Sequence, residues 1–96
     1  MQEKELLKLA INDTDILSSK QKEVFITLCN ANFPLSSGTI ESSMGVTRQA
    51  VYLTLKALLN RGFITRTKER VFLYSPNKLK ELELIERYKD KISSKK

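Results

Sequence analysis

The stretch 45-GVTRQAVYLTLKALLNRGFI-64 predicts a helix with a clear start and a clear end. Thr47 is a favourable N-cap, because its hydroxyl can accept a hydrogen bond from a free backbone N–H of the first turn. Gly62 follows the last residue of the apolar repeat, where helices commonly end in a left-handed conformation that glycine adopts at little cost. We therefore expect a helix over residues 48–61.

This helix has an apolar face and a polar face. The apolar stripe recurs at helical spacing and consists of Val51, Thr54, Leu55 and Leu58. The other side carries Gln49, Tyr52, Leu53, Lys56 and Asn60. An ordinary solvated helix of this length would carry several carboxylates, but residues 47–60 contain none. One interpretation is an exposed amphipathic helix without a partner; the lack of carboxylates favours a polyanionic partner.

Residues at the start of this helix are of the types that recognise DNA bases. Arg48 and Gln49 form paired hydrogen bonds with guanine and adenine edges in the major groove. Tyr52 and Lys56 follow one turn later, within reach of a thymine methyl group or a phosphate. These residues predict a helix that reads double-stranded DNA.

Positive charge is concentrated on the same segment. The chain of 96 residues has a formal net charge of +6, which indicates a polyanionic partner. Residues 1–46 contain four lysines and six carboxylates, whereas residues 47–70 contain six Lys or Arg residues and one carboxylate. The charge therefore favours the same surface as the helix pattern.

Composition narrows the possible function classes. With 41% apolar and 29% charged residues, the sequence predicts one globular domain over residues 1–96. We expect a cytoplasmic, nucleoid-associated protein, because the sequence has no membrane-length apolar run and no secretory signal pattern. The chain contains no histidine and a single cysteine, Cys29, which we expect to be buried rather than redox-active. Since catalytic constellations and metal ligands are missing from this pattern, we expect neither an enzyme nor a cofactor or metal.

The residues before the candidate reading helix complete a helix-turn-helix pattern. Ser36 or Ser37 caps a helix of about two turns, and Gly45 then makes a tight turn ahead of Thr47. Two further helices precede this unit. The first covers residues 2–11, and the second follows a cap at residues 18–19 and ends near residues 30–32.

A basic hairpin follows the candidate reading helix. Residues 63–67 (FITRT) and 71–75 (VFLYS) are rich in β-forming residues and are separated by a short polar turn. Arg66, Lys68 and Arg70 lie at or near this turn. They either protect an edge strand from aggregation or belong to a wing that grips DNA beside the helix, and their position in the chain favours the wing.

The last helix, over about residues 77–92, has one apolar face. Pro76 ends the second strand and Asn77 caps the helix, whose apolar residues recur every three or four positions: Leu79, Leu82, Ile85, Tyr88 and Ile92. The helix either folds back on a core of about residues 17–76 or pairs with a second copy of the chain. We favour a homodimer, with Leu6 and Leu9 of the first helix alongside. Residues 93–96 are expected to fray.

The fold class that these elements predict is mainly α with a small β-hairpin (α+β), a winged helix-turn-helix with flanking N- and C-terminal helices. The run MGVTRQAVYLTLKALLNRGFI and the ending at Tyr74, Pro76 and Leu79 resemble the DNA-binding domain of MarR-type and TrmB-type transcription regulators over about residues 17–82. The resemblance implies base contacts by Thr47, Arg48, Gln49 and Tyr52, phosphate contacts by Ser36, Ser37 and Thr39, and a wing that includes Lys68 and Arg70.

The function that we expect is sequence-specific binding of double-stranded DNA by a small homodimeric transcriptional repressor. One alternative keeps DNA binding but assigns it to plasmid partition, replication or conjugation. Another alternative is a winged-helix protein–protein interaction module, and a regulatory protein partner is compatible with either DNA-binding role. The carboxylate-free helix face favours DNA binding over protein interaction.

Overall fold

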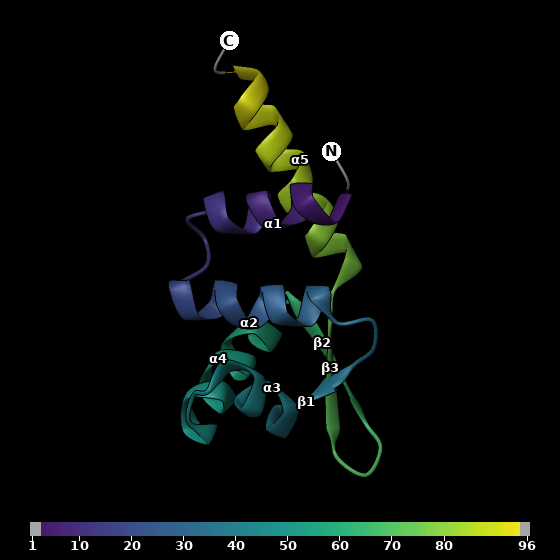
Figure 1. Cartoon of the computed structure of the whole chain (residues 1–96). Coiled ribbons are helices and arrows are strands. Elements are labelled where there is room, and N and C mark those ends of the chain that lie inside the picture. Colours follow the sequence, from purple (N-terminus) through teal and green to yellow (C-terminus); the bar gives the residue numbers. More distant parts are fainter. Residues whose placement is uncertain (1–2, 95–96) are drawn as a thin grey trace.

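The computed structural model describes residues 3–94, which form five helices and three short strands. In chain order these are α1 (Glu3–Asp13), α2 (Ser19–Asn30), β1 (Leu35–Ser36), α3 (Ser37–Met44), α4 (Arg48–Asn60), β2 (Ile64–Lys68), β3 (Phe72–Pro76) and α5 (Lys78–Ser94). Figure 1 shows α2, α3, α4 and the sheet in one unit, with α1 beside α2 and α5 extending away. The expected winged helix-turn-helix with flanking helices is confirmed.

The helix boundaries follow local signals. Ser18 caps α2: its hydroxyl accepts a hydrogen bond from the Gln21 N–H at 3.2 Å, while the Gln21 side chain accepts one from the Ser18 N–H at 3.1 Å. This reciprocal pair is a capping box. The first helix runs on to Asp13, and its expected start at Gln2 lies outside the described residues. At the other end α5 continues to Ser94 instead of fraying at residue 93, and residues 95–96 lie outside the described part.

The sheet contains one strand that the sequence did not predict. The hairpin strands β2 and β3 pair antiparallel, with Lys68 opposite Phe72. On the other side of β3, the short strand β1 places Leu35 opposite Tyr74 and Ser36 opposite Leu73, which gives the order β1-β3-β2. Because α3 begins directly after β1, this pairing anchors the start of the helix-turn-helix to the hairpin.

A single hydrophobic core joins the helix-turn-helix, the hairpin and the flanking helices. Its most completely buried side chains come from four helices and are Ile11, Val24, Phe25, Leu28, Ile40, Val51, Leu55 and Leu58. The rings of Phe25 and Phe63 meet edge to face, with centroids 5.7 Å apart. Phe63 immediately follows Gly62, so this contact fixes the point where the chain leaves α4 and enters β2.

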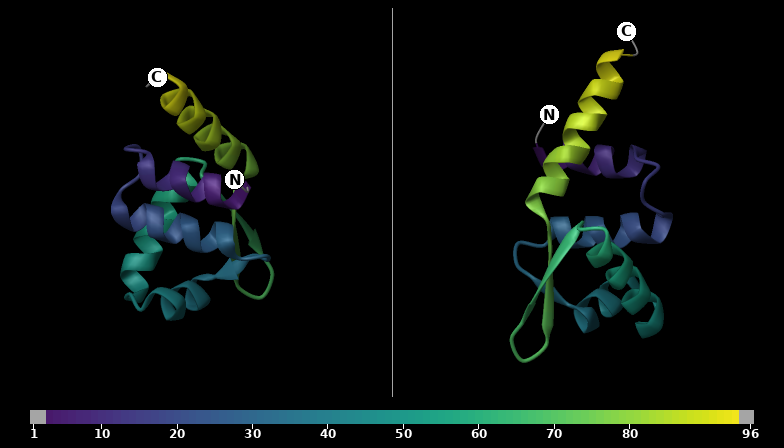
Figure 2. Two further views of the ribbon diagram at one scale, coloured as in Figure 1. Left: turned by 45° about the horizontal axis from the view of Figure 1, so that its top comes forward. Right: turned by 180° about the vertical axis from the view of Figure 1, so that it is seen from behind.

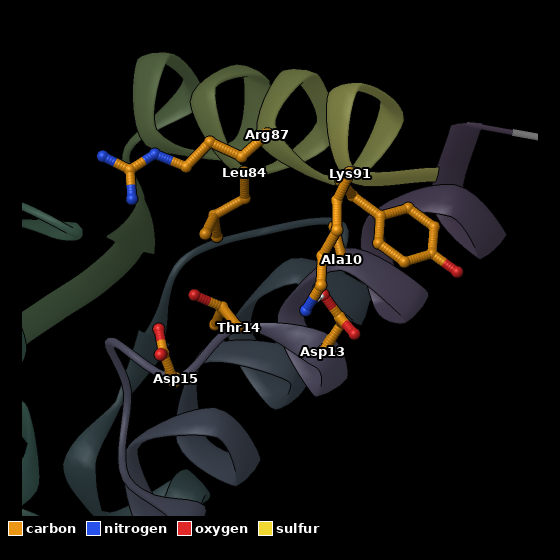
Figure 3. A pocket seen from close by; sticks show the side chains of 8 residues that line it. Ala10, Asp13, Thr14, Asp15, Leu84, Arg87 and Lys91 are labelled. Carbon is orange, nitrogen blue, oxygen red and sulfur yellow. Dashed lines mark hydrogen bonds and ion pairs between the residues drawn. The ribbon is translucent and has the colours of Figure 1, made fainter. Parts of the chain in front are cut away.

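The first half of α5 packs on α1. Leu84 and Ile85 are buried in the shared core and Tyr88 is half-buried. In Figure 3 the side chains of Lys91 and Asp13 point toward one another, and their Nζ and Oδ2 atoms are 3.0 Å apart. Ile85, which we expected on the dimer surface, is only 5% exposed because α5 folds back on α1 here. The apolar stripe of α5 therefore serves the core in part.

The remaining apolar residues of α5 stay exposed within one chain. Leu79 is 70% exposed, and Leu82 and Ile92 are each 45% exposed. Residues 89–94 are all exposed, and Figure 2 shows this end of α5 projecting from the rest of the molecule. The principal extents of 49 × 23 × 21 Å reflect this projection.

Two glycines provide a matched test of the backbone. Gly62 has φ +77°, a left-handed backbone conformation that residues with a side chain rarely adopt. An added Cβ would meet only Lys80 Cε at 3.9 Å, so a side chain would be strained by the backbone conformation and not by a steric clash. We expect Gly62→Ala to lower the free energy of unfolding by about 1–2 kcal/mol. Gly38→Ala, inside α3, should raise it by up to about 1 kcal/mol. Urea denaturation at one fixed protein concentration measures both; equal midpoints for Gly62→Ala and the wild type would contradict the conformational requirement.

Candidate nucleic-acid interface

Short-range hydrogen bonds set the turn between α3 and α4. Of the two expected caps of α3 the structure uses Ser36, whose hydroxyl accepts a hydrogen bond from the Thr39 N–H at 3.2 Å. At the other end Gly45 adopts φ +66°, and its N–H donates to the Glu41 carbonyl at 2.9 Å. Thr47 caps α4 as expected, accepting a hydrogen bond from the Ala50 N–H at 3.2 Å. The start of α4 is thereby fixed relative to α3.

The two faces of α4 are as the sequence predicted. Its buried side is made of Val51, Thr54, Leu55 and Leu58, and the Thr54 hydroxyl donates a hydrogen bond to the Ala50 carbonyl at 2.8 Å. The exposed side chains of α4 are Arg48, Gln49, Tyr52, Leu53, Lys56 and Asn60. Leu53 is 56% exposed on this otherwise polar side. No role was predicted for Leu53 from the sequence, although contact with a thymine methyl group suits such a side chain.

Two adjoining hollows lie beside α4 and the sheet. The first, of about 490 Å³, is lined by Ser37, Arg48, Gln49, Tyr52, Leu55 and Tyr74. The second, of about 270 Å³, includes Tyr52, Lys56, Arg66 and Tyr74 in its lining. Because Tyr52 and Tyr74 border both, the hollows form one groove along α4. The groove brings together the start of α3, the outer side of α4 and the middle of the hairpin.

The hairpin holds its cations against an aromatic ring. The Arg66 guanidinium lies 4.2 Å and the Lys68 Nζ 4.4 Å from the centre of the Phe72 ring, so both make cation–π contacts. Phe72 was not among the predicted site residues. The signal was nevertheless present, because alternation along a strand puts Arg66 and Lys68 on one face and the hairpin register puts Phe72 opposite Lys68.

Most of the predicted DNA-binding residues lie on one side of the molecule. Ser37, Arg48, Gln49, Tyr52, Lys56 and Arg66 line the groove. Ser36 caps α3 and Thr39 lies in its first turn, and their hydroxyl oxygens are 3.0 Å apart. Lys68 and Arg70 lie beyond the groove toward the exposed tip of the hairpin.

A separate hollow of about 210 Å³ lies between α1 and α5 (Figure 3). It is lined by Ala10, Asp13, Thr14, Asp15, Leu84, Arg87, Tyr88 and Lys91. The Lys91–Asp13 ion pair at its edge joins α1 to α5. Because the hollow is lined by charges of both signs, it does not resemble an anion-binding site.

Metal binding, membrane spanning and thiol chemistry have little support in residues 3–94. These residues contain no group of three or more His, Cys, Asp or Glu side chains that could hold a metal ion, and no helix suited by length and hydropathy to span a membrane. Burial, and secondly the nearby Glu81 carboxylate, raise the pKa of the Cys29 thiol well above its usual range. The thiol therefore stays protonated at neutral pH and is a poor nucleophile.

Residues 17–80 match the family described as "Sugar-specific transcriptional regulator TrmB". The chain belongs to the TrmB family. The expected resemblance is thus confirmed, and residues 17–80 form a winged-helix domain of a family of transcriptional regulators. TrmB-family proteins are transcriptional regulators and are not enzymes. Comparison with curated protein sequences gives no significant match.

Solved structures with the same fold include proteins from several bacteria. ZitR of Lactococcus lactis, solved in complex with DNA, has a TM-score of 0.65 and 23% identity, covering 77% of this chain and 52% of ZitR. An ArsR-like regulator from Rhodococcus sp. RHA1 has a TM-score of 0.62 and 22% identity, covering 97% and 81%. RV1404 from Mycobacterium tuberculosis has a TM-score of 0.66 and 17% identity, covering 97% and 68%. The TrmB-family chain therefore spans about half the length of ZitR, and these likenesses concern the fold.

Thr47 supplies a test of how the start of α4 is held. Thr47→Ala removes the acceptor for the Ala50 N–H and should lower the free energy of unfolding by about 1 kcal/mol. Thr47→Ser keeps the hydroxyl, so its urea midpoint should stay close to that of the wild type. A loss in Thr47→Ser as large as that in Thr47→Ala would contradict the capping role.

Proposed function

We propose that this TrmB-family chain is a homodimeric, sequence-specific repressor that binds double-stranded DNA in the cytoplasm. The observation that carries the proposal is the exposed side of α4 and the basic hairpin beside it. From Thr47 to Lys68 the sequence contains no carboxylate, so no acidic side chain of this segment opposes a polyanion. Arg48 and Gln49 add the donor and acceptor groups that base edges require.

Within this proposal α4 specifies the sequence and its neighbours fix the register. Arg48, Gln49 and Tyr52 contact bases together with Thr47, because they stand in the first turns of α4, where such a helix meets the major groove. Around them, Ser36, Ser37 and Thr39 of the α3 start, Lys56 of α4, and Arg66, Lys68 and Arg70 of the hairpin contact phosphates. The shared groove supports this division, because Ser37 and Arg66 line it along with residues of α4.

The aromatic ring of Phe72 contributes to the wing in an indirect way. Its contacts with Arg66 and Lys68 restrict two long side chains that would otherwise sample many rotamers. Side chains that are ordered before binding lose less conformational entropy when they meet a phosphate. Phe72 thus favours a wing that is already arranged for DNA.

The proposed dimer uses the exposed apolar residues at the opposite end of the molecule. Leu79, Leu82 and Ile92 of α5 and Leu9 of α1 are each at least 40% exposed, and Leu6 and Tyr88 flank them half-buried. A second copy of α1 and α5 would cover these side chains by a two-fold contact. In this arrangement residues of about 17–76 form the reading unit and residues 77–92 the dimer helix, and the two reading units address half-sites about one helical turn apart.

The proposed dimer predicts that charges at exposed apolar positions of α5 separate the copies without unfolding them. We expect the double change Leu82→Asp and Ile92→Asp to give a folded monomer by light scattering at micromolar concentration, with weakened DNA binding. Val71→Asp is the matched control, because Val71 is a similarly exposed apolar residue but lies in the hairpin. This variant should keep the molar mass of a dimer. A monomeric wild type would refute the dimer.

Variants of the reading helix α4 and variants of the hairpin wing are expected to change DNA binding in different ways. Gln49→Ala or Arg48→Ala should cost about 1–3 kcal/mol on the preferred site and relax base preference at one position per half-site. Lys68→Ala or Arg70→Ala should instead weaken every duplex by a similar factor and flatten the salt dependence by about one unit per lost phosphate contact. Gln49→Ala changes no charge, so it isolates base reading from electrostatics.

Selection from a random duplex library, followed by salt titration of the enriched site, measures both effects. With about eight phosphate contacts per dimer, the wild-type slope of log K against log salt should be roughly −7. A slope shallower than about −3 would favour the protein-interaction alternative. Enrichment of the same motif at unchanged stringency by Arg48→Ala would show that α4 does not read bases.

A further inference from the structure

A single carboxylate borders the carboxylate-free surface at the start of α4. Glu41 belongs to α3, and its Oε1 atom lies 3.8 Å from Nε of Arg48. The Glu41 side chain is 21% exposed, whereas that of Arg48 is 89% exposed. A carboxylate in this position is repelled by DNA phosphates, so Glu41 lowers the affinity for DNA in general.

The geometry of the contact leaves the reading edge of Arg48 available. A guanidinium has five N–H donors, and only one of them is on Nε. Glu41 approaches that nitrogen, so the terminal nitrogens of Arg48 retain the donors needed for paired hydrogen bonds to guanine. Glu41 therefore contacts Arg48 through Nε and leaves the donors of the two terminal nitrogens outside this ion pair.

The backbone keeps Glu41 in place for this contact. Its carbonyl accepts the Gly45 N–H at 2.9 Å, which closes the end of α3 just before the turn. Its side chain, being only partly exposed, samples fewer positions than that of Arg48. The better fixed partner thus restrains the freer one across the turn between α3 and α4.

Solvent screening determines when the contact matters. In the free protein Arg48 is almost fully exposed, so the ion pair adds little to stability. When DNA displaces water from the groove, screening weakens and the same pair favours one orientation of the guanidinium. An arginine restrained in this way pairs well with one base and adapts poorly to the others.

We propose that Glu41 is a positioning residue that orients Arg48 toward one base pair of each half-site and raises discrimination there while lowering affinity for DNA in general. This inference rests on the proposed base-reading role of Arg48. Glu41 is thus expected to raise specificity and to lower affinity. A residue with a merely structural role would not produce that combination.

The test compares Glu41→Gln with wild type, using the base pair whose preference relaxes in Arg48→Ala. Glu41→Gln keeps the shape of the side chain and removes its charge. Discrimination at that base pair should fall by about threefold or more, while affinity for an unrelated duplex of the same length should rise. In an Arg48→Ala background, Glu41→Gln should cause no further change in base preference.

Glu69→Gln is the matched control. Glu69 lies in the hairpin turn, where the same change removes a negative charge close to the proposed wing contacts. It should raise affinity for all duplexes and leave base preference unchanged. Arg48→Lys provides a second variant, because it keeps the charge and loses the planar fork; it should relax the same base pair and preserve the salt slope.

The outcomes separate the inference from the proposed function. If Arg48→Ala relaxes one base pair but Glu41→Gln enriches the wild-type motif at the same stringency, Glu41 does not position Arg48 and the DNA-reading proposal stands. If Arg48→Ala changes no preference, base reading by Arg48 is wrong and the role of Glu41 fails with it. If Glu69→Gln relaxes the base preference as much as Glu41→Gln does, the relaxation in both variants is a general effect of charge, which also overturns the inference.

Discussion

The side chain of Asn77 connects the two helices on which the proposed function depends. Its Nδ2 donates to the Gly62 carbonyl at 2.9 Å, just after the end of α4, and its Oδ1 accepts the Leu79 N–H at 3.0 Å, at the start of α5. Its backbone N–H donates to the Phe63 carbonyl at 2.8 Å. Because one residue satisfies groups at both helix ends, the direction of α5 follows that of α4. In a dimer built on α5, this junction would set the distance between the two reading helices.

The molecule separates two kinds of surface along its long axis of 49 Å. One end presents cations and hydrogen-bonding side chains of α4 and the hairpin, and the other presents exposed apolar residues of α5. Electrostatic attraction acts over nanometre distances and would bring the protein to DNA, whereas apolar burial acts at contact and would hold the two chains of the proposed dimer together. Keeping the surfaces apart allows both to be occupied at once, as a DNA-bound dimer requires.

Features controlled by neighbouring residues could be predicted from the sequence. The expected helix over residues 48–61 differs from α4 by one residue, because Thr47 and Gly62 act within a turn of the chain. The strand β1 could not be predicted, since two residues carry no periodic pattern. Helical spacing revealed the apolar face of α5 but not that α1 would bury Ile85, because periodicity does not identify the covering element. Phe72 and Glu41 were missed for a related reason: their contacts cross a strand pair and a turn.

In the proposed complex, DNA meets the outer side of α4 together with the hairpin and the start of α3. NMR spectroscopy of the ¹⁵N-labelled protein, titrated with a DNA duplex, maps this contact surface residue by residue. We expect the largest amide shifts at residues 36–39, 47–56 and 66–72, and small shifts at the solvent-facing residues of α2 and in the second half of α5. Large shifts around the hollow between α1 and α5, with residues 47–56 unmoved, would contradict the proposed complex.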